Sequence, residues 1–408
     1  MKRQLPPALR LRPFALLWTA SLTNGLAAQM IVVAIGWQVY HLHNDPLDLG
    51  LVGLAEFLPL LVLALPAGAL ADRASRRLIA IVAGAIHICI AGALLVITIS
   101  GVTSIWPYLG VGVLAGTMSA IGSPATRALT PELVPGELLQ GAIALRNVAG
   151  QIGVVVGPAL GGIIFAVKPS AVYVIAGALL TVSLAAYIGL PRTRTRTDEP
   201  VNWENLVAGI RFIGRTRVIL GVILLDLFGV LLGDPIALAP AFADILGVGP
   251  VGLGALRTAT SIGALLAAFL IARRSPRWPA GAAMLAVVAI FGVSTIVFGL
   301  SKSLPLSLAA LFVSGFVDMI SVNIRATMLA ILTPLRLQGR VNSVEWVFIS
   351  ASNELGAFEA GGMASLLGPV RAVVLGGGLM IGIAASWRRL FPELSRLGPL
   401  DELESAGE

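Results

Sequence analysis

Gly68-Ala-Leu-Ala-Asp72-Arg73-Ala-Ser-Arg76-Arg77-Leu-Ile79 is a short polar stretch that separates two long apolar runs. Its glycine allows close backbone approach, and its aspartate can accept hydrogen bonds from the N-terminus of a neighbouring helix. Its arginines favour the cytoplasmic face of a membrane. The stretch therefore predicts a cytoplasmic loop between the second and third helices of a membrane protein.

The composition also indicates a membrane protein. Hydrophobic residues make up 57% of the 408 positions and charged residues 12%, whereas soluble domains carry about 25% charged residues. The mean hydropathy is +0.92, and the apolar runs are each long enough to cross about 30 Å of hydrocarbon. We predict an all-α polytopic protein with twelve transmembrane helices, at residues 14–40, 49–71, 78–99, 105–127, 139–165, 171–190, 218–243, 251–272, 279–300, 304–326, 341–367 and 370–390.

The basic residues predict the orientation of the chain. Of the 28 Lys and Arg residues, all but five lie on the side that both termini share, and the five are Arg146, Lys168, Arg257, Lys302 and Arg371. Because Lys and Arg accumulate on the cytoplasmic side, we expect a multi-pass protein of the cell membrane with both termini in the cytoplasm. The net charge of +7 then reflects topology and attraction to membrane lipid, and we expect no nucleic acid as a partner.

The chain divides into two halves joined by a linker. We place the first six-helix half at 1–190, a cytoplasmic linker at 191–217, the second half at 218–390 and a cytoplasmic tail at 391–408. Apolar residues at helical spacing in the linker predict an amphipathic helix, either on the membrane surface or against the bundle.

Short sequences recur between the halves. The pairs are Thr130-Pro131 with Thr333-Pro334, Leu139-Gln140-Gly141 with Leu337-Gln338-Gly339, and Gly161-Gly162 with Gly361-Gly362. Two six-helix pseudo-repeats are typical of a rocking transporter whose site lies between its halves.

The opening stretch resembles the signature between helices 2 and 3 of the major facilitator superfamily, G-x-L-A-D-R-x-x-R-[RK]. The resemblance implies the major facilitator fold and a conformational latch, in which Asp72 meets helix 11 in the outward-facing state. Breaking the latch would shift the rocking equilibrium. We assign the latch to Gly68, Asp72, Arg73, Arg76, Arg77 and Arg127. Arg127 and Arg325 end their helices at matching places, so both either join this network or anchor lipid headgroups.

The fifth span carries a second resemblance, in Gly153-Val-Val-Val-Gly157-Pro158-Ala-Leu-Gly161-Gly162. Its glycines recur every four residues and form one smooth helix face, which Pro158 bends. The order resembles the antiporter signature of major facilitator exporters, which ends G-x-x-x-G-P-x-x-G-G, although Ala144 replaces an earlier glycine of that pattern. The resemblance favours export over import, and a general small-residue packing motif is the alternative.

Ionisable residues inside the spans are functional candidates because hydrocarbon disfavours charge. We expect Asp318 and Glu354 either to handle protons or a cationic substrate or to form structural hydrogen bonds. Asp234 and Arg257 are expected to form a structural ion pair, and Glu359 is expected to lie too near the outer mouth to take part. The candidates for substrate or proton binding are Glu56, Arg146, Asp226, Asp318, Asn353 and Glu354.

Nearly the whole chain resembles the bacterial exporter branch of this superfamily that includes the enterobactin exporter and macrolide-efflux proteins. The stretches that carry the resemblance are 69–77, 130–141, 206–213 and 337–343. It implies a monomeric secondary exporter that exchanges protons for a small amphipathic solute, siderophore or drug-like, by alternating access. A facilitator or importer of the same fold, and a non-transporting scaffold or sensor, are the alternatives. Since the sequence has no phosphate-loop motif, metal-ligand cluster or nucleophile–base pair, we expect no cofactor, no metal site and no enzyme activity.

Overall fold

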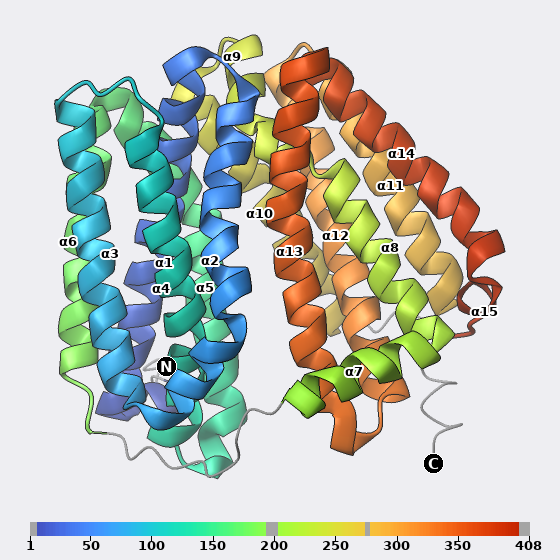
Figure 1. The fold of residues 1–408 in the computed structure, drawn as a ribbon, viewed down its shortest axis with the longest axis horizontal. Helices are drawn as coiled ribbons and strands as arrows, with labels where there is room; N and C mark the ends of the chain where they lie inside the picture. Colours follow the sequence, from blue (N-terminus) through green and yellow to red (C-terminus); the bar gives the residue numbers. More distant parts are fainter. Residues whose placement is uncertain (1–5, 193–202, 274–277, 400–408) are drawn as a thin grey trace, which may run out of the picture. The chain divides into compact units, whose positions relative to one another are not determined.

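The computed structural model describes residues 6–192, 203–273 and 278–399, and the side chains of all of these except 64–73, 203–208, 343 and 346 (Figure 1). Every regular element in these ranges is a helix. The elements are η1 (Pro7–Arg10), α1 (Arg12–His43), α2 (Pro46–Arg73), α3 (Arg76–Ile99), α4 (Trp106–Leu133), α5 (Gly136–Val167), α6 (Pro169–Ile188), α7 (Trp203–Arg215), α8 (Arg217–Gly233), η2 (Pro235–Leu238), α9 (Ala239–Ile245), α10 (Gly249–Arg273), α11 (Ala280–Leu300), α12 (Leu304–Leu332), α13 (Leu335–Leu367), α14 (Pro369–Leu390) and α15 (Pro392–Ser395).

The helices match the predicted membrane spans. Eleven segments of the described chain are long and apolar enough to cross a membrane, with α8, η2 and α9 forming one of them. The one predicted span missing from these eleven, at 341–367, corresponds to α13, which has 33 residues and contains three acids, Glu345, Glu354 and Glu359, that lower its hydropathy. The prediction of an all-α polytopic membrane protein is therefore confirmed.

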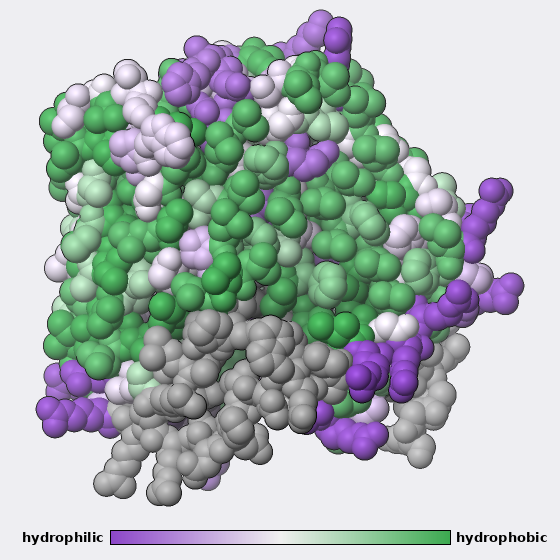
Figure 2. All heavy atoms as spheres, in the orientation of Figure 1, coloured by the Kyte–Doolittle hydropathy of each residue, from purple (hydrophilic) through white to green (hydrophobic). Residues whose placement is uncertain are grey.

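Apolar side chains cover the outside of the helices. Val62, Val96 and Leu366 are 70%, 62% and 85% exposed. Figure 2 shows green hydrophobic residues along the middle of the helices that it draws and purple hydrophilic residues toward the helix ends. Soluble monomers rarely expose apolar patches larger than a few hundred Å², so this surface is suited to hydrocarbon.

The chain forms two compact units. The first contains Met1–His43, Ala55–Val201 and Gly249–Thr258, and the second contains Asn44–Leu54, Asn202–Val248 and Ala259–Glu408. The first turns of α2 and of α10 thus each belong to the unit that holds the other half of the sequence. The domain boundaries proposed from the sequence stay predictions.

In the first unit, α1 packs against α5 and α6, and α3 packs against α4 and α6. Phe14, Leu17 and Met30 of α1 are fully buried. The indole Nε1 of Trp18 donates a hydrogen bond to the carbonyl oxygen of Leu145 at 2.9 Å. Such bonds matter because hydrocarbon offers a buried polar group no alternative partner.

In the second unit, α11 packs against α12 and α14, and α8 packs against α13 and α14. The Nε1 of Trp387 on α14 donates to the carbonyl oxygen of Gly221 on α8 at 2.9 Å. A Cβ on Gly221 would lie 2.8 Å from Cδ1 of Phe391. A glycine is therefore needed for α8 to come this close to the end of α14.

The amphipathic helix α7 runs across the ends of α8 and α13 (Figure 1). A Cβ on Gly209 would lie 2.9 Å from the carbonyl oxygen of Arg340, so α7 rests directly on α13. Ile213 is 4% exposed against the bundle, whereas Ile210 is 51% exposed. We call this end of the second unit the α7 end, and the end that carries η2 and α9 the α9 end.

The segment after α14 is fixed at the α7 end. Leu394 of α15 is buried, and the backbone N–H of Ala280 donates to the carbonyl oxygen of Gly398 at 3.0 Å. Arg217 Nη1 lies 3.0 Å from Glu393 Oε1. Hydrogen bonds from its own backbone N–H and from Arg217 hold the pKa of the exposed Glu393 carboxyl below its usual range.

Candidate functional site

A buried arginine joins three helices of the second unit. Arg325 on α12 is 4% exposed, and its Nε lies 3.0 Å from Glu345 Oε1 on α13. Its Nη1 forms an ion pair with Oδ1 of Asp226 on α8, whose side chain is 10% exposed. We call these three residues the Arg325 triad. When all three are ionised, the triad carries one net negative charge inside the helix bundle.

The burial of Arg325 bears on one of its two predicted roles. A side chain that is 4% exposed does not anchor lipid headgroups, and the partners of Arg325 are Asp226 and Glu345; its membership of the predicted latch stays a prediction. Burying an ion pair costs desolvation energy, and good geometry on both sides of the guanidinium offsets that cost. The triad therefore depends on α8, α12 and α13 being packed together.

The triad adjoins a small cavity that Asp318 lines. Asp318 precedes Arg325 on α12 by seven residues, or about two turns, so both project from similar faces of the helix. The cavity is also lined by Asp226, Ser321 and apolar residues of α8, α11 and α12, and it has room for about one water molecule. Asp318 is partly buried, and among the described residues it forms no hydrogen bond or ion pair.

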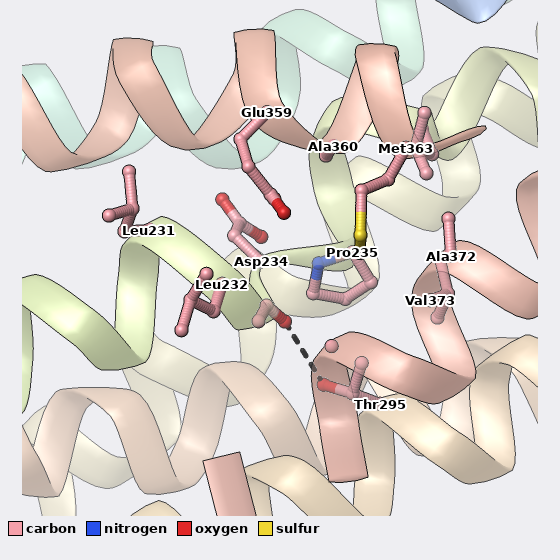
Figure 3. A pocket seen from close by; sticks show the side chains of 13 residues that line it. Leu231, Leu232, Asp234, Pro235, Thr295, Glu359, Ala360, Met363, Ala372 and Val373 are labelled. Carbon is pink, nitrogen blue, oxygen red and sulfur yellow. Dashed lines mark hydrogen bonds between the residues drawn. The ribbon is translucent and has the colours of Figure 1, made fainter. Parts of the chain in front are cut away.

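A second pair of carboxylates lies at the α9 end. Figure 3 shows Asp234 and Glu359 pointing toward one another in a pocket between α8, η2 and α13. Asp234 also begins η2, where it accepts a hydrogen bond from the backbone N–H of Ile236 at 3.0 Å. Thr295 donates to the carbonyl oxygen of Gly233 at 3.4 Å beneath them. Asp234 and Arg257 belong to different units, so the ion pair expected between them stays a prediction.

Arg146 in the first unit binds backbone. Its Nη1 donates to the carbonyl oxygens of Thr126 and Arg127, at 3.3 and 3.1 Å, and to the hydroxyl of Thr130 at 3.0 Å. Pro131 has no N–H, so the carbonyl of Arg127 lacks its partner within α4. Arg146 supplies that missing donor. The geometry gives Arg146 a structural part, and its candidacy as a substrate or proton site stays a prediction.

The glycine face of α5 packs against α1. A Cβ on Gly153 would lie 2.7 Å from the carbonyl carbon of Gly25, and one on Gly161 would lie 2.9 Å from Cα of Met30. Gly157 faces Gln29 in the same way, at 2.5 Å from its Cβ. Gly162 points to the other side, where it meets the backbone of Pro250 at the start of α10. The run therefore permits close packing on two sides of α5, and its link to antiport stays a prediction.

The arginines after the polar loop fix α3 within the first unit. Arg76 forms an ion pair with Glu132 on α4. Arg77 donates from Nε to the carbonyl oxygen of Tyr187, at 3.4 Å, and from Nη2 to that of Ile188, at the C-terminal end of α6. A cation at this end of a helix is favourable because the last carbonyls lack partners. The side chains of Gly68, Asp72 and Arg73 lie outside the described residues, so the latch stays a prediction.

The other candidates lie apart from the triad. Glu56 on α2 sits where Gly116 of α4 meets its backbone, and the side chain of Arg127 is exposed on α4. Asn353 is exposed on α13. Glu354 approaches the first turns of α2 in the second unit, with Oε2 3.3 Å from the position of a Cβ on Gly53.

Sequence reasoning missed the partnership of Glu345 with Arg325 and the facing of Glu359 and Asp234. The spacing of the two glutamates along α13 indicates that they share one face of the helix. Glu345 and Glu359 are 14 residues apart on α13, close to four helical turns, which places them near one face. Which helix that face meets depends on packing, and spacing alone does not give it.

Comparisons with known proteins agree with this architecture. A family model described as a transmembrane secretion effector matches residues 5–404. The multidrug efflux pump Tap of Mycolicibacterium fortuitum is 29% identical over 373 residues, which cover 87% of this chain and 90% of Tap. The enterobactin exporter EntS of Escherichia coli is 27% identical over 363 residues, 88% of this chain and 86% of EntS.

Solved structures show the same fold. A bacterial homologue of the human lysosomal transporter Spinster, inward-facing and occupied, superposes with a TM-score of 0.74 at 16% identity and covers 93% of this chain and 96% of its own. A bacterial homologue of the iron transporter ferroportin, also inward-facing, gives 0.69 at 17% identity, with 92% and 98% covered.

Proposed function

Because the chain belongs to the transmembrane secretion effector family of the major facilitator superfamily, we propose that it exports a small amphipathic solute in exchange for protons, by alternating access. It is a multi-pass membrane transporter and not an enzyme. The proposal adds the direction of transport, the coupling ion and the solute class.

Asp318 is the observation that carries the proposed coupling. An acid within a membrane span is a candidate proton carrier, because it must be neutral or paired where the site is dry and can ionise where water reaches it. Its cavity gives it access to water, and the Arg325 triad lies beside it. Protonation there changes the charge at a point where three helices meet, which is a means of biasing two conformations.

The orientation follows from the basic residues. With both termini in the cytoplasm, the α7 end faces the cytoplasm and the α9 end faces outward. Arg217, Arg336 and Arg340 then lie near anionic lipid headgroups, which favours this placement. One chain contains both units, so we take a monomer as the transporting form.

The remaining sequence candidates serve the conformational change in this proposal. Arg76 and Arg77 hold α3 to α4 and α6, which gives the end of α2, where Asp72 lies, a firm base. Gly153, Gly157 and Gly161 hold α5 close to α1, so that these helices move as one body. Asp72 and its neighbours act as the latch between the conformations.

The solute class comes from the relatives. One is a multidrug efflux pump and another an enterobactin exporter, so a macrolide and a catechol siderophore are the first solutes to test. Cells that express the wild type, Asp72→Asn or Asp318→Asn are loaded with each solute, and efflux is followed with and without a protonophore.

We expect efflux of one solute from wild-type cells that the protonophore abolishes and that both variants reduce at least tenfold. Efflux that the protonophore does not change would support a facilitator. Accumulation of the solute inside the cells that the protonophore prevents would support an importer. Equal efflux from expressing and empty cells, for both solutes, would contradict the solute class.

A further inference from the structure

Four arginines at the α7 end of the second unit have side chains that reach solvent. Arg211 and Arg215 lie on α7 and are exposed, and Arg336 and Arg340 lie in the first two turns of α13, exposed and half-buried. Among the described residues, none of these four guanidinium groups forms a hydrogen bond or an ion pair. We call the four residues the α7–α13 arginines.

Neighbouring arginines of the same unit do have carboxylate partners. Arg325 is bound between Asp226 and Glu345, and Arg217 lies 3.0 Å from Glu393. The acids of the α7 end whose side chains are described are therefore already engaged with other cations. The α7–α13 arginines leave an excess of positive charge that the described part of the protein does not balance.

The arrangement of the α7–α13 arginines suits an anion. Arg211 and Arg215 are four residues apart, as are Arg336 and Arg340, so each pair shares one face of its helix. Like charges at this spacing destabilise a helix, and an anion bound to them removes the repulsion. The two helices cross next to these pairs, since a Cβ on Gly209 would lie 2.9 Å from the carbonyl oxygen of Arg340.

The connection to α8 holds α7 at the boundary of the membrane. The helix α7 ends at Arg215, and the apolar segment 217–245, which can cross a membrane, begins two residues later. Two residues reach at most about 7 Å. Because α7 also runs across the ends of α8 and α13 (Figure 1), its outer face lies at the depth of the lipid headgroups.

Large apolar side chains lie exposed beside the arginines. Ile210 precedes Arg211 and is 51% exposed, and Leu335 precedes Arg336 and is 87% exposed. Basic residues next to exposed apolar ones are typical of helices that lie in the membrane interface. A phospholipid offers a phosphate to the first and acyl chains to the second. A soluble acidic protein would match the charge alone, so the surface favours lipid.

We propose that the α7 end binds anionic phospholipids, with their phosphates at the α7–α13 arginines and their acyl chains at Ile210 and Leu335. Bound lipid then fastens α7 to α13, the helix that Glu345 joins to α12. The inference needs only the membrane setting of the fold. It depends neither on the direction of transport nor on the coupling ion.

The test measures which lipid contacts α7 in the full-length protein, reconstituted in liposomes. A fluorophore is attached to Gly214→Cys, an exposed position of α7 with open space around it, after Cys89→Ser has removed the one native cysteine. Brominated phosphatidylglycerol, which is anionic, and brominated phosphatidylcholine, which has no net charge, are compared as quenchers.

Two variants and one control separate charge from packing. The variants are Arg211→Gln/Arg215→Gln/Arg336→Gln/Arg340→Gln and the matching set with lysine at all four positions, which keeps the charge. The control is Lys302→Gln/Arg371→Gln, which removes two exposed cations at the α9 end of the same unit.

We expect phosphatidylglycerol to be preferred at α7 by at least about fivefold in the wild type, the lysine variant and the control, and the preference to vanish in the glutamine variant. Equal quenching by the two lipids in the wild type would overturn the proposal. A preference that survives in the glutamine variant would overturn the assignment to these arginines. Loss in the lysine variant or in the control would also contradict it, since packing or overall charge would then explain the effect.

A second measurement needs no label. A ligand that binds the folded state alone raises its stability, so phosphatidylglycerol added to mixed micelles should raise the denaturant midpoint of the wild type and of the control. The glutamine variant should show no such rise. An equal rise in the glutamine variant would show that the lipid stabilises the protein elsewhere and would overturn the fastening of α7.

Discussion

Replacing Arg325 by methionine removes the charge of the triad and keeps most of the volume of the side chain. Asp226 and Glu345, which are 10% and 17% exposed, would then face one another without a cation. Removing one member of a buried ion pair costs about 3–5 kcal/mol, because a charge is left buried and uncompensated. We expect Arg325→Met to lower the free energy of unfolding by that amount.

The acids account for the loss, so neutralising them should reverse it. In the triple variant Arg325→Met/Asp226→Asn/Glu345→Gln no charge remains, and replacing a whole buried ion cluster is often neutral or stabilising. Unfolding is followed by denaturant titration of the purified protein in mixed micelles. Arg217→Met is the control: its partner Glu393 is at the surface, the pair is 69% and 41% exposed, and we expect no measurable change.

Two results would refute the reasoning. One is a loss below about 1 kcal/mol in Arg325→Met, which is the size of an exposed ion pair. The other is a triple variant no more stable than the single one, which would show that Arg325 stabilises by packing alone.

Three further perturbations test other contacts. Gly161→Leu should lower the free energy of unfolding by about 1–3 kcal/mol, because the larger side chain overpacks against α1. Gly150→Leu on the same helix is the control and should have no such effect, since a Cβ at Gly150 has no neighbour within 4 Å. The same denaturant titration measures both. Arg146→Met should lower the free energy of unfolding by about 1–3 kcal/mol, because it leaves the carbonyl of Arg127 without a hydrogen bond. Adding Pro131→Ala should restore part of that stability, because alanine supplies the missing N–H within α4. Because the pKa of Glu393 is lowered, its contact fully stabilises the docking of α15 above the ordinary glutamate pKa, and this stabilisation is lost as the pH falls through the lowered pKa. Hydrogen exchange of the last residues, compared with Glu393→Gln at both pH values, should show faster opening at acidic pH in the wild type alone.

The fold was predictable because its signals are local. Runs of apolar residues set the number and length of the membrane helices, and polar or proline-containing breaks set their ends. The interruption at Asp234-Pro235 was less accessible, since its residues lie within one apolar run and only the backbone shows that α8 ends there. The exchange of the first turns of α2 and α10 between the units depends on packing and leaves no pattern in the sequence.

The candidate site was predictable in parts. The sequence alone singles out Asp226 and Asp318, because an acid within a membrane span is energetically costly and is therefore a functional candidate. Their grouping with Arg325 and Glu345 requires the rotation of three helices about their axes, which hydropathy does not determine. Arg325 also resembled an ordinary cytoplasmic helix end in sequence, and its burial became evident only from the packing.

The internal repeat carries opposite charges at one matching position of its two halves. In sequence Thr333-Pro334 matches Thr130-Pro131, yet Pro131 lies inside α4 while Pro334 precedes α13, as Pro135 precedes α5. Counted from Pro135 and Pro334, Arg146 and Glu345 occupy the same position, eleven residues along their helices.

That position faces the preceding long helix in both units, and the two units use it differently. In the first unit Arg146 donates to α4 carbonyls, one of which Pro131 leaves without a partner. In the second unit Glu345 binds the guanidinium of Arg325 on α12. In the first unit the position therefore carries a cation that supports the backbone of α4, and in the second unit it carries a carboxylate that joins α13 to α12. One repeated position has thus diverged from a contact with backbone carbonyls to a contact between charged side chains.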